Sequence, residues 1–345
     1  MIRLGLCCQF LDSPIQFRTA THRYVATLEP EGRRAYLADI AGHNAGALAA
    51  AVERCHELGI GAFRMTSQIL PLATHPQSGY TLDQLDPSGG ISGAYEWAGA
   101  LARAYDVRLS LHPDQFVVLN SEREAVVKSA VQELELQAEV AELVGADVIV
   151  VHAGGASGGV PAAVERLERG LELLSPRARG RLALENDDRC FTPLSLGRLC
   201  ERTSVPLVYD AHHHRCLPDG LSVAEASELA FGTWHDREPY AHISSPRDGW
   251  ESPNPRAHAD YIDPADFPAA WRDRTLTVDV EAKAKERAVL ALKDALAGCE
   301  ELGRGHVSRV PDRDAGHSEL GADAPGRARE TRSGADAGAG GKVDG

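Results

Sequence analysis

Short, almost continuous apolar runs recur along most of the chain, and a longer segment with helical spacing of apolar positions follows each of them. Runs of this kind, rich in Val, Ile and Leu, predict strands that are buried on both faces, as in a parallel sheet. We predict strands at residues 2–6, 60–66, 107–112, 146–152, 181–186, 206–210, 240–245 and 275–283.

The segments between these runs predict helices, and Gly59 stands where a helix-terminating glycine is expected. The predicted helices cover residues 39–58, 93–105, 123–144, 160–174, 194–202, 223–231 and 285–296, with a helical turn near residues 264–271. Eight strand–helix units in one chain of 345 residues fit a single (β/α)8 TIM barrel better than a doubly wound α/β sheet.

The composition changes after residue 302, where Gly, Ala, Asp and Arg dominate and large apolar side chains almost disappear. A segment of this kind cannot bury a core. We therefore expect a barrel domain at residues 1–302 and a disordered, low-complexity tail at residues 303–345.

The chain carries a net charge of −14, which does not favour a broad surface that coats nucleic acid. The tail carries seven acidic and seven basic residues, so the acidity belongs to the barrel. Carboxylates that hold divalent cations count as negative until the metal binds. An enzyme that acts on DNA therefore remains compatible with this charge.

The cysteines and the apolar runs bear on the cellular compartment. Seven scattered cysteines without a CxxC pair indicate a reducing cytoplasm. No apolar run approaches the roughly 20 residues of a membrane span, and the first residues lack the cleavage pattern of a secretory signal. We expect a cytoplasmic protein without a membrane partner.

Polar residues of one chemical kind follow the predicted strands. In a TIM barrel the active site lies at the carboxyl ends of the strands, which converge on one centre. A single His or Asp there is more often a loop anchor or a helix cap. Here metal-binding residue types occur at or just beyond seven successive strand ends, namely His75, His112, His152, Glu185, Asp210, His242, His258 and Glu281.

The mixture of imidazole and carboxylate suits Mn²⁺, Zn²⁺, Fe²⁺ or Co²⁺, whereas a site for Mg²⁺ alone would contain fewer histidines. The set exceeds the four to six ligands of one ion, so two or three ions are expected, with Glu185 or Glu281 bridging them. Closely spaced metals are the standard arrangement for phosphodiester hydrolysis. The residues thus predict a multinuclear metallohydrolase for a phosphoester substrate, with a metal-dependent sugar isomerase as the main alternative.

Seven segments of the chain resemble the UV damage endonuclease family, from about residue 2 to residue 296. They are FRMTSQILPLATHP, LSLHPDQFVVLNS, VIVVHAGGA, LALENDDR, VYDAHHHR, HISSPRDGW and VEAKAKE. The resemblance implies a TIM barrel related to endonuclease IV. It also implies nicking of DNA immediately 5′ to UV photoproducts (cyclobutane dimers and 6-4 products), and often at abasic sites, with divalent metals that are typically manganese.

The resemblance also implies a set of site residues. The family's metal ligands fall on the eight residues named above and on His213, which follows Asp210 in an Asp-x-x-His pattern. This leaves His212 and His214 to loop or supporting roles. Among the ligands, we expect Glu185, Glu281, His112 and His242 to be the catalytic residues.

The HPDQF motif resembles the family's His-Pro-Gly-Gln-Tyr type signature, whose last two residues probe the helix next to a flipped-out damaged dinucleotide. Here these residues are Gln115 and Phe116. Phe can fill the unpaired space, and Gln can hydrogen-bond the exposed opposite bases. The alternative for Phe116 is an ordinary core position.

The chain departs from the family pattern in two places. Some members carry a modified lysine two residues before the histidine of the seventh strand, where this chain has Tyr240. The LCCQF segment after the first strand lacks the Tyr and Asn that some members use near the lesion. Arg18, Arg23 and Arg247 are candidate phosphate contacts, although surface arginines are usually only solvated.

The sequence thus predicts a monomeric DNA repair endonuclease with two or three divalent ions, Mn²⁺ first and Mg²⁺, Zn²⁺ or Co²⁺ as alternatives. Its expected partner is UV-damaged double-stranded DNA. The alternatives are an abasic-site endonuclease of the endonuclease IV type, a sugar isomerase of the xylose isomerase type, and a lesion-binding protein whose metals are only structural.

Overall fold

The computed structural model of the protein describes residues 1–305, with the side chains of residues 1–298. Eight parallel strands close into a barrel in the order of the sequence, because β1 pairs with both β2 and β8. The strands are β1 Ile2–Cys7, β2 Ala62–Met65, β3 Arg108–Leu111, β4 Val148–His152, β5 Leu182–Glu185, β6 Leu207–Asp210, β7 Tyr240–Ile243 and β8 Leu276–Val280. The predicted TIM barrel is confirmed.

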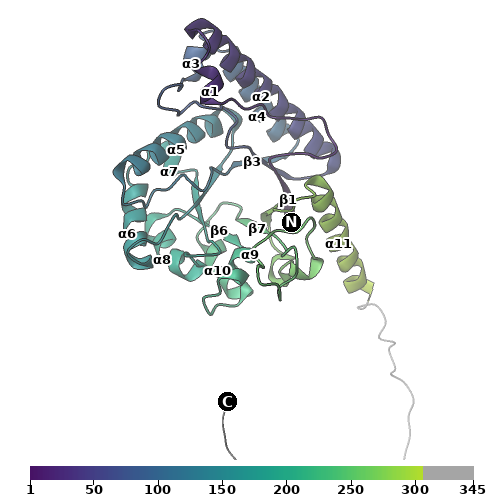
Figure 1. Ribbon diagram of the computed structural model, residues 1–345. Helices are drawn as coiled ribbons and strands as arrows, with labels where there is room; N and C mark the ends of the chain where they lie inside the picture. Colours follow the sequence, from purple (N-terminus) through teal and green to yellow (C-terminus); the bar gives the residue numbers. More distant parts are fainter. Residues whose placement is uncertain (306–345) are drawn as a thin grey trace, which may run out of the picture. The chain divides into compact units, whose positions relative to one another are not determined.

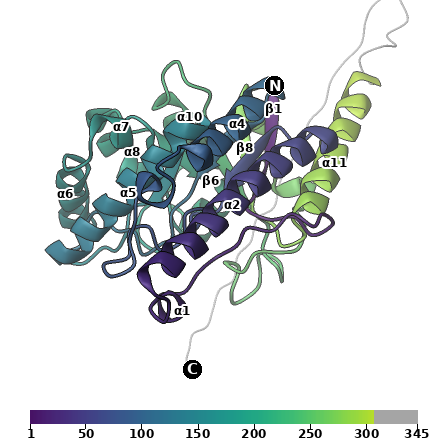
Figure 2. The same ribbon diagram turned by 90° about the horizontal axis from the view of Figure 1, so that it is seen from above.

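Helices connect the strands and surround the barrel (Figure 1). Figure 2 shows the two helices of the first two units, α2 and α4, side by side along one flank. The α-helices are α1 His22–Val25, α2 Pro30–Leu58, α3 Leu82–Leu85, α4 Gly90–Ala104, α5 Glu124–Val144, α6 Val160–Leu171, α7 Pro176–Arg179, α8 Pro193–Thr203, α9 Ala211–Cys216, α10 Val223–Gly232 and α11 Glu286–Gly305. Two 3₁₀ helices, η1 Pro264–Asp266 and η2 Ala269–Trp271, precede β8. Within residues 1–305, no helix combines the length and the apolar character needed to cross a bilayer.

Helices α2, α9 and α11 depart from the sequence prediction, and the four-residue helices α1, α3 and α7 were not predicted. Helix α2 begins at Pro30 rather than at residue 39, because a proline at the first helical position starts a polar turn that carries no apolar spacing. Helix α9 replaces a predicted loop, and the Asp210 carboxylate caps it by accepting the His213 backbone N–H. Helix α11 continues to Gly305, beyond its predicted end at residue 296.

The domain boundary and the tail stay predictions. Met1–Glu301 forms one compact unit. The disordered tail predicted for residues 303–345 lies, apart from its first three residues, outside the described residues.

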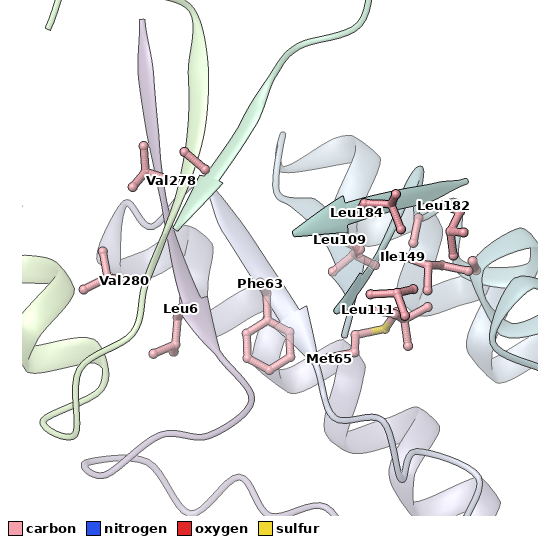
Figure 3. Close-up of a cluster of buried hydrophobic side chains, with 14 of the residues drawn as sticks. Leu6, Phe63, Met65, Leu109, Leu111, Ile149, Leu182, Leu184, Val278 and Val280 are labelled. Carbon is pink, nitrogen blue, oxygen red and sulfur yellow. The ribbon is translucent and has the colours of Figure 1, made fainter. Parts of the chain in front are cut away.

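The main hydrophobic core lies between the strands and the helices. Alternate strand residues such as Leu6, Phe63 and Leu184 are buried there together with the inner faces of the helices (Figure 3). Because side chains alternate along a strand, the residues between them point into the barrel. The side chains that face the helices therefore stabilise the fold. The side chains that point into the barrel can be polar and can take part in a functional site.

The barrel interior is divided into an apolar side and a polar side. Val148, Val150, Ala183 and Val208, from β4 to β6, pack inside with Trp234 and Tyr240. Polar side chains of β2, β3, β7 and β8 occupy the rest of the interior, namely the half-buried Arg64 and the buried Ser110, His242, Thr277 and Asp279. This polar half extends up to the carboxyl ends of the strands, where the candidate site begins.

Candidate metal centre

Pairing between strands brings the predicted ligands to one level of the barrel. His152 on β4 lies in register with Glu185 on β5, and Asp210 on β6 lies in register with His242 on β7. These four residues are the last or nearly the last residues of their strands, as the polar strand ends predicted.

Glu185 is the common neighbour of four imidazoles, and its side chain is only 1% exposed. Its Oε2 atom lies 2.8 Å from His112 Nε2 and 3.6 Å from His152 Nδ1. Its Oε1 atom lies 3.1 Å from His242 Nδ1 and 3.3 Å from His213 Nδ1. The two carboxylate oxygens therefore divide the histidines into two pairs.

Glu281, just beyond β8, forms the other carboxylate corner. Its Oε1 atom lies 3.6 Å from His242 Nδ1, and its Oε2 atom lies 3.8 Å from His258 Nδ1. The Arg64 guanidinium approaches the same carboxylate at 2.5 Å. Arg64 thereby supplies positive charge to a region that otherwise gathers carboxylates.

Asp210 and His213 belong together through helix α9. Asp210 Oδ1 accepts the backbone N–H of His213, and Asp210 Oδ2 lies 3.4 Å from His213 Nδ1. One carboxylate oxygen thus caps the helix, and the other faces the histidine that the helix presents.

Two groups of three residues have ligand atoms close enough to share one ion each. They are His112 with His152 and Glu185, and Glu185 with Asp210 and His213. Glu185 is common to both groups. A carboxylate that offers one oxygen to each of two neighbouring groups is placed as a bridging ligand would be.

Hydrogen bonds among the ligand side chains leave several of their donor and acceptor atoms unsatisfied, whereas bound cations would satisfy them. His112 Nδ1 lies 3.0 Å from the Pro113 carbonyl while Nε2 faces Glu185, so a neutral ring with one N–H cannot satisfy both acceptors. Within the described residues, Asp210 Oδ2 and His152 Nδ1 are buried and have no hydrogen-bond partner. Buried polar atoms without partners are costly, and metal ions would satisfy all of these positions.

The local charges shift the pKa values in opposite directions. Burial acts to raise the pKa of Glu185, but the imidazoles of His242, His152, His112 and His213 outweigh it and hold this pKa well below its usual range. Burial acts to lower the pKa of His242, but Glu185 and Glu281 together outweigh burial and raise it to about 9. Burial likewise opposes the shift at His213, whose pKa Asp210 and Glu185 raise well above the ordinary value.

His112 differs from these histidines because burial dominates there and lowers its pKa. Without metal, the centre is thus a network of carboxylates with protonated His242 and His213. Any cation that binds must displace these protons.

A cavity of about 540 Å³ opens onto the centre. Glu185, Glu281 and His213 line it together with Gln115, one of the two predicted DNA-probing residues. The other, Phe116, is 80% exposed, so the ordinary core position considered for it is wrong. Together they place a polar side chain at the site and a free aromatic ring beside it.

His75 is the one predicted ligand that the structure does not bring to the centre. Its ring stacks on His22 with centroids 4.3 Å apart, and its Nδ1 accepts the backbone N–H groups of Gln77 and Ser78. It lines a neighbouring cavity together with Phe116.

The outer histidines of the triplet have other surroundings. His214 contacts the Tyr209 hydroxyl at 2.8 Å and Asp219 at 2.9 Å, so it supports the backbone around helix α9. His212 is fully buried and packs against Trp250 and His258. Two of the candidate phosphate contacts form ion pairs with close neighbours, Arg18 with Asp39 and Arg247 with Asp248.

The sequence reasoning missed three residues around the centre, namely the half-buried Arg64 and the buried Asn186 and Asp279. A signal was available for two of them, because Arg64 interrupts the apolar run of β2 and Asp279 precedes Glu281 by two positions. Residues two apart in a strand share a face. Asn186 had no such signal beyond its place next to Glu185.

Comparison with known proteins matches residues 2–311 to the family model described as UV-endonuclease UvdE. The chain is 36% identical to the UV DNA damage endonuclease of Deinococcus radiodurans, over 84% of this chain and 94% of that protein. The crystal structure of SacUVDE is similar, with a TM-score of 0.76 and 27% identity over 88% of this chain and 99% of that one. Endonuclease IV from Thermus thermophilus shares the fold, with a TM-score of 0.55 and 20% identity over 86% and 99% of the two chains.

Proposed function

The chain belongs to the UV-endonuclease UvdE family and is a DNA repair endonuclease, and from this premise we propose that it hydrolyses the phosphodiester bond immediately 5′ to UV photoproducts by multinuclear metal catalysis. The substrates proposed are cyclobutane dimers and 6-4 products in double-stranded DNA. The cofactors proposed are two or three divalent ions, with Mn²⁺ the first choice.

The position of Glu185 is the single observation that carries the metal part of the proposal. Its oxygens face His112 and His152 on one side and His213 and His242 on the other, at 2.8 to 3.6 Å. The two groups of three ligands have only Glu185 in common. A single ion needs four to six ligands, so it would use only part of the donor atoms gathered here. The arrangement supports at least two ions with Glu185 between them.

The residues that would hold these ions are those whose donor atoms face one another at the strand ends. They are His112, His152, Glu185, Asp210, His213, His242, His258 and Glu281. His75 stays a predicted ligand on the resemblance alone. Bound divalent ions would activate water and stabilise the negative charge that develops on the attacked phosphate.

The protein's own groups prepare the centre for this chemistry. The Pro113 carbonyl can hold the proton of His112 on Nδ1, which leaves Nε2 as a lone-pair donor beside Glu185. Arg64 pairs with Glu281 and helps to keep that carboxylate ionised, because burial acts to raise the Glu281 pKa and the charges of Arg64, His242 and His258 together outweigh burial. His112 and Glu281 are thus held in the protonation states that bind a cation, whereas His242 and His213 must first give up a proton.

Gln115 and Phe116 support recognition of a distorted duplex. Gln115 lines the cavity of the metal centre, and the exposed Phe116 lines the neighbouring cavity. An exposed ring can fill the space left by displaced bases, and an amide can hydrogen-bond the unpaired bases of the other strand. Recognition would therefore depend on how easily the damaged bases unstack from their neighbours in the duplex.

A nicking assay tests the proposal directly. The substrates are three otherwise identical duplexes that carry one thymine dimer, one abasic site or no lesion, each with Mn²⁺ and with or without a chelator. We expect metal-dependent cleavage at the bond 5′ to the dimer, with a 3′-hydroxyl and a 5′-phosphate at the nick because the 3′-oxygen is the leaving group.

A pair of matched substitutions links the cleavage to the centre. Glu185→Gln should lower the cleavage rate by at least about 100-fold, because even residues that only support a metal ligand are worth 10- to 100-fold. Glu286→Gln is the control, since Glu286 is also a buried carboxylate but accepts the backbone N–H groups of Leu11 and Asp12. It should cleave at nearly the wild-type rate.

Three results would overturn the proposal. Cleavage of the abasic duplex with an intact dimer duplex would indicate an abasic-site endonuclease. Dimer cleavage that persists in chelator or in Glu185→Gln would exclude the metal centre. A protein that cuts none of the duplexes but interconverts sugars would indicate the isomerase alternative.

A further inference from the structure

A buried carboxylate lies directly beneath the centre and has not been assigned a role by the function proposed above. Asp279 precedes Glu281 by two positions on β8, so both side chains point into the barrel. It is fully buried. Gly5 on the neighbouring strand leaves room for it, because a Cβ atom at residue 5 would lie 2.3 Å from Asp279 Oδ1.

The two oxygens of Asp279 have different surroundings. Oδ1 accepts the hydroxyl proton of Tyr240 at 3.0 Å, and the same hydroxyl oxygen lies 2.9 Å from Ser110 Oγ. Oδ2 is buried and has no hydrogen-bond partner in the described part of the chain. It faces His242 Nε2 at 3.8 Å and Arg64 Nη1 at 3.7 Å.

His242 Nε2 is the second buried atom without a partner at this point. The other nitrogen of the ring, Nδ1, faces the centre, at 3.1 Å from Glu185 and 3.6 Å from Glu281. A histidine that binds a metal through one nitrogen carries its proton on the other, and an acceptor for that proton fixes the ring. The only carboxylate recorded near Nε2 among residues 1–298 is Asp279.

We propose that Asp279 is a positioning residue that accepts the Nε2 proton of His242 and so directs Nδ1 toward the metals, and that Tyr240 holds Asp279 in this orientation. The proposal rests on the metal centre proposed above. The 3.8 Å between Asp279 Oδ2 and His242 Nε2 exceeds the length of a direct hydrogen bond. A small rotation of either side chain, or one bridging water, would complete the contact.

Arg108 contacts the Tyr240 ring and holds it in place. The Arg108 guanidinium carbon lies 5.0 Å from the centre of the Tyr240 ring, and Arg108 Nη1 donates to Thr277 Oγ1 at 3.0 Å. The carboxylate beneath His242 thus comes from β8.

The test uses metal binding by the full chain after chelator treatment, followed by titration with Mn²⁺. Asp279→Leu removes the acceptor but keeps a branched side chain, and it should weaken Mn²⁺ binding by about 10- to 100-fold. Asp279→Asn keeps an acceptor oxygen and should restore most of the affinity. Tyr240→Phe removes only the hydroxyl and should weaken binding by about tenfold, at the lower end of that range.

Ser110→Ala is the matched control, because it also removes a buried hydrogen bond of Tyr240 but does not touch Asp279. It should bind Mn²⁺ like the wild type. A second readout is the nitrogen spectrum of the Zn²⁺-loaded protein with labelled histidine. We expect His242 to carry its proton on Nε2 and to bind through Nδ1 in the wild type, and to lose this signature in Asp279→Leu.

Two results would overturn the proposal: Asp279→Leu and Tyr240→Phe binding Mn²⁺ as tightly as Ser110→Ala, or metal bound to Nε2 of His242 in the wild type. If Asp279→Leu does not fold, Tyr240→Phe and the wild-type spectrum still decide the matter. A wild-type protein that binds Mn²⁺ but leaves the dimer duplex intact would contradict the proposed function and leave the role of Asp279 to these measurements.

Discussion

The Asn186 side chain holds the backbone of Asp210 with two hydrogen bonds. Its Oδ1 atom accepts the Asp210 N–H, and its Nδ2 atom donates to the Asp210 carbonyl, both at 2.9 Å. Asn186 directly follows Glu185, and both residues are buried. The contact therefore fixes two of the proposed metal-binding carboxylates relative to each other, across the ends of β5 and β6.

Asn186→Ala should weaken both the fold and the centre. Loss of the amide leaves two buried backbone groups of Asp210 unpaired, which costs about 1–3 kcal/mol of unfolding free energy. Because Asp210 would no longer be held in place, Mn²⁺ affinity should fall by about 10- to 100-fold. Urea unfolding and Mn²⁺ titration measure the two effects.

Asn44→Ala provides the matched control for this prediction. Asn44 is equally buried and also bridges backbone groups, those of Arg18 and Ile69, away from the centre. It should lose stability to a similar extent and keep the wild-type Mn²⁺ affinity. Equal losses of affinity in the two variants would mean that Asn186 contributes only to the fold.

Phe116→Ala should impair damage recognition and leave the fold unchanged. The ring is 80% exposed, so the unfolding free energy should change by less than about 0.5 kcal/mol. Stacking of an aromatic ring on bases is worth about 1–3 kcal/mol, which corresponds to a roughly 5- to 150-fold loss of affinity for a dimer-containing duplex.

Fluorescence anisotropy in a chelator measures this binding without cleavage. Trp97→Ala is the control, since Trp97 is also a large exposed aromatic residue, at 62% exposure, but lies on α4. It should bind like the wild type. If both variants bind the dimer duplex equally well, Phe116 is not a probe.

The metal-free protein should lose stability as the pH rises above neutrality. The pKa of His242 is raised from 6.5 to about 9 mainly by Glu185, so its contribution is fully present below about 6.5 and is lost as the pH passes through about 9. The loss should be on the order of 3 kcal/mol. Below about 4.5 a second loss is expected, because protonation of Glu185, whose pKa is depressed, breaks the same contacts.

Urea unfolding of the chelator-treated chain across this pH range measures the loss of stability on both the alkaline and the acidic side. In Glu185→Gln, the unfolding free energy should depend less on pH above neutrality, because the carboxylate that raises the His242 pKa is gone. In Mn²⁺ the trend should reverse, because the cation competes with protons for the same imidazoles. A metal-free protein that becomes more stable between neutral pH and about 9 would contradict the prediction.

Gly5→Ala should destabilise the barrel through Asp279. The added Cβ atom would lie 2.3 Å from Asp279 Oδ1, which must then move away from Tyr240. Overpacking of this kind costs about 1–3 kcal/mol. Thermal unfolding measures it, with Gly42→Ala on α2 as the control. Gly42 has open space around it, so alanine there should stabilise the protein by up to about 1 kcal/mol. Equal stability of the two variants would show that Asp279 is free to move.

The repeating units and the ligands at the strand ends could be predicted from the sequence because both are local patterns. An apolar run such as VIVVH specifies a strand that is buried on both faces, and the barrel rule then assigns the polar residue at its end to a common centre. His152, Glu185 and Asp210 were found in this way. The start of α2 was missed because its first turn is polar and carries no apolar period.

Only the tertiary structure decided how these residues are arranged around one another. That Glu185 rather than Glu281 has four histidine neighbours, that His75 lies apart, and that Asn186 fixes Asp210 all depend on side chains from strands far apart in the sequence. The same holds for Asp279, whose proposed role depends on Gly5 and Tyr240 on the two adjacent strands. A periodic pattern determines which face of a strand a residue occupies, whereas distances between side chains are set only when the barrel closes and each buried polar atom must find a partner.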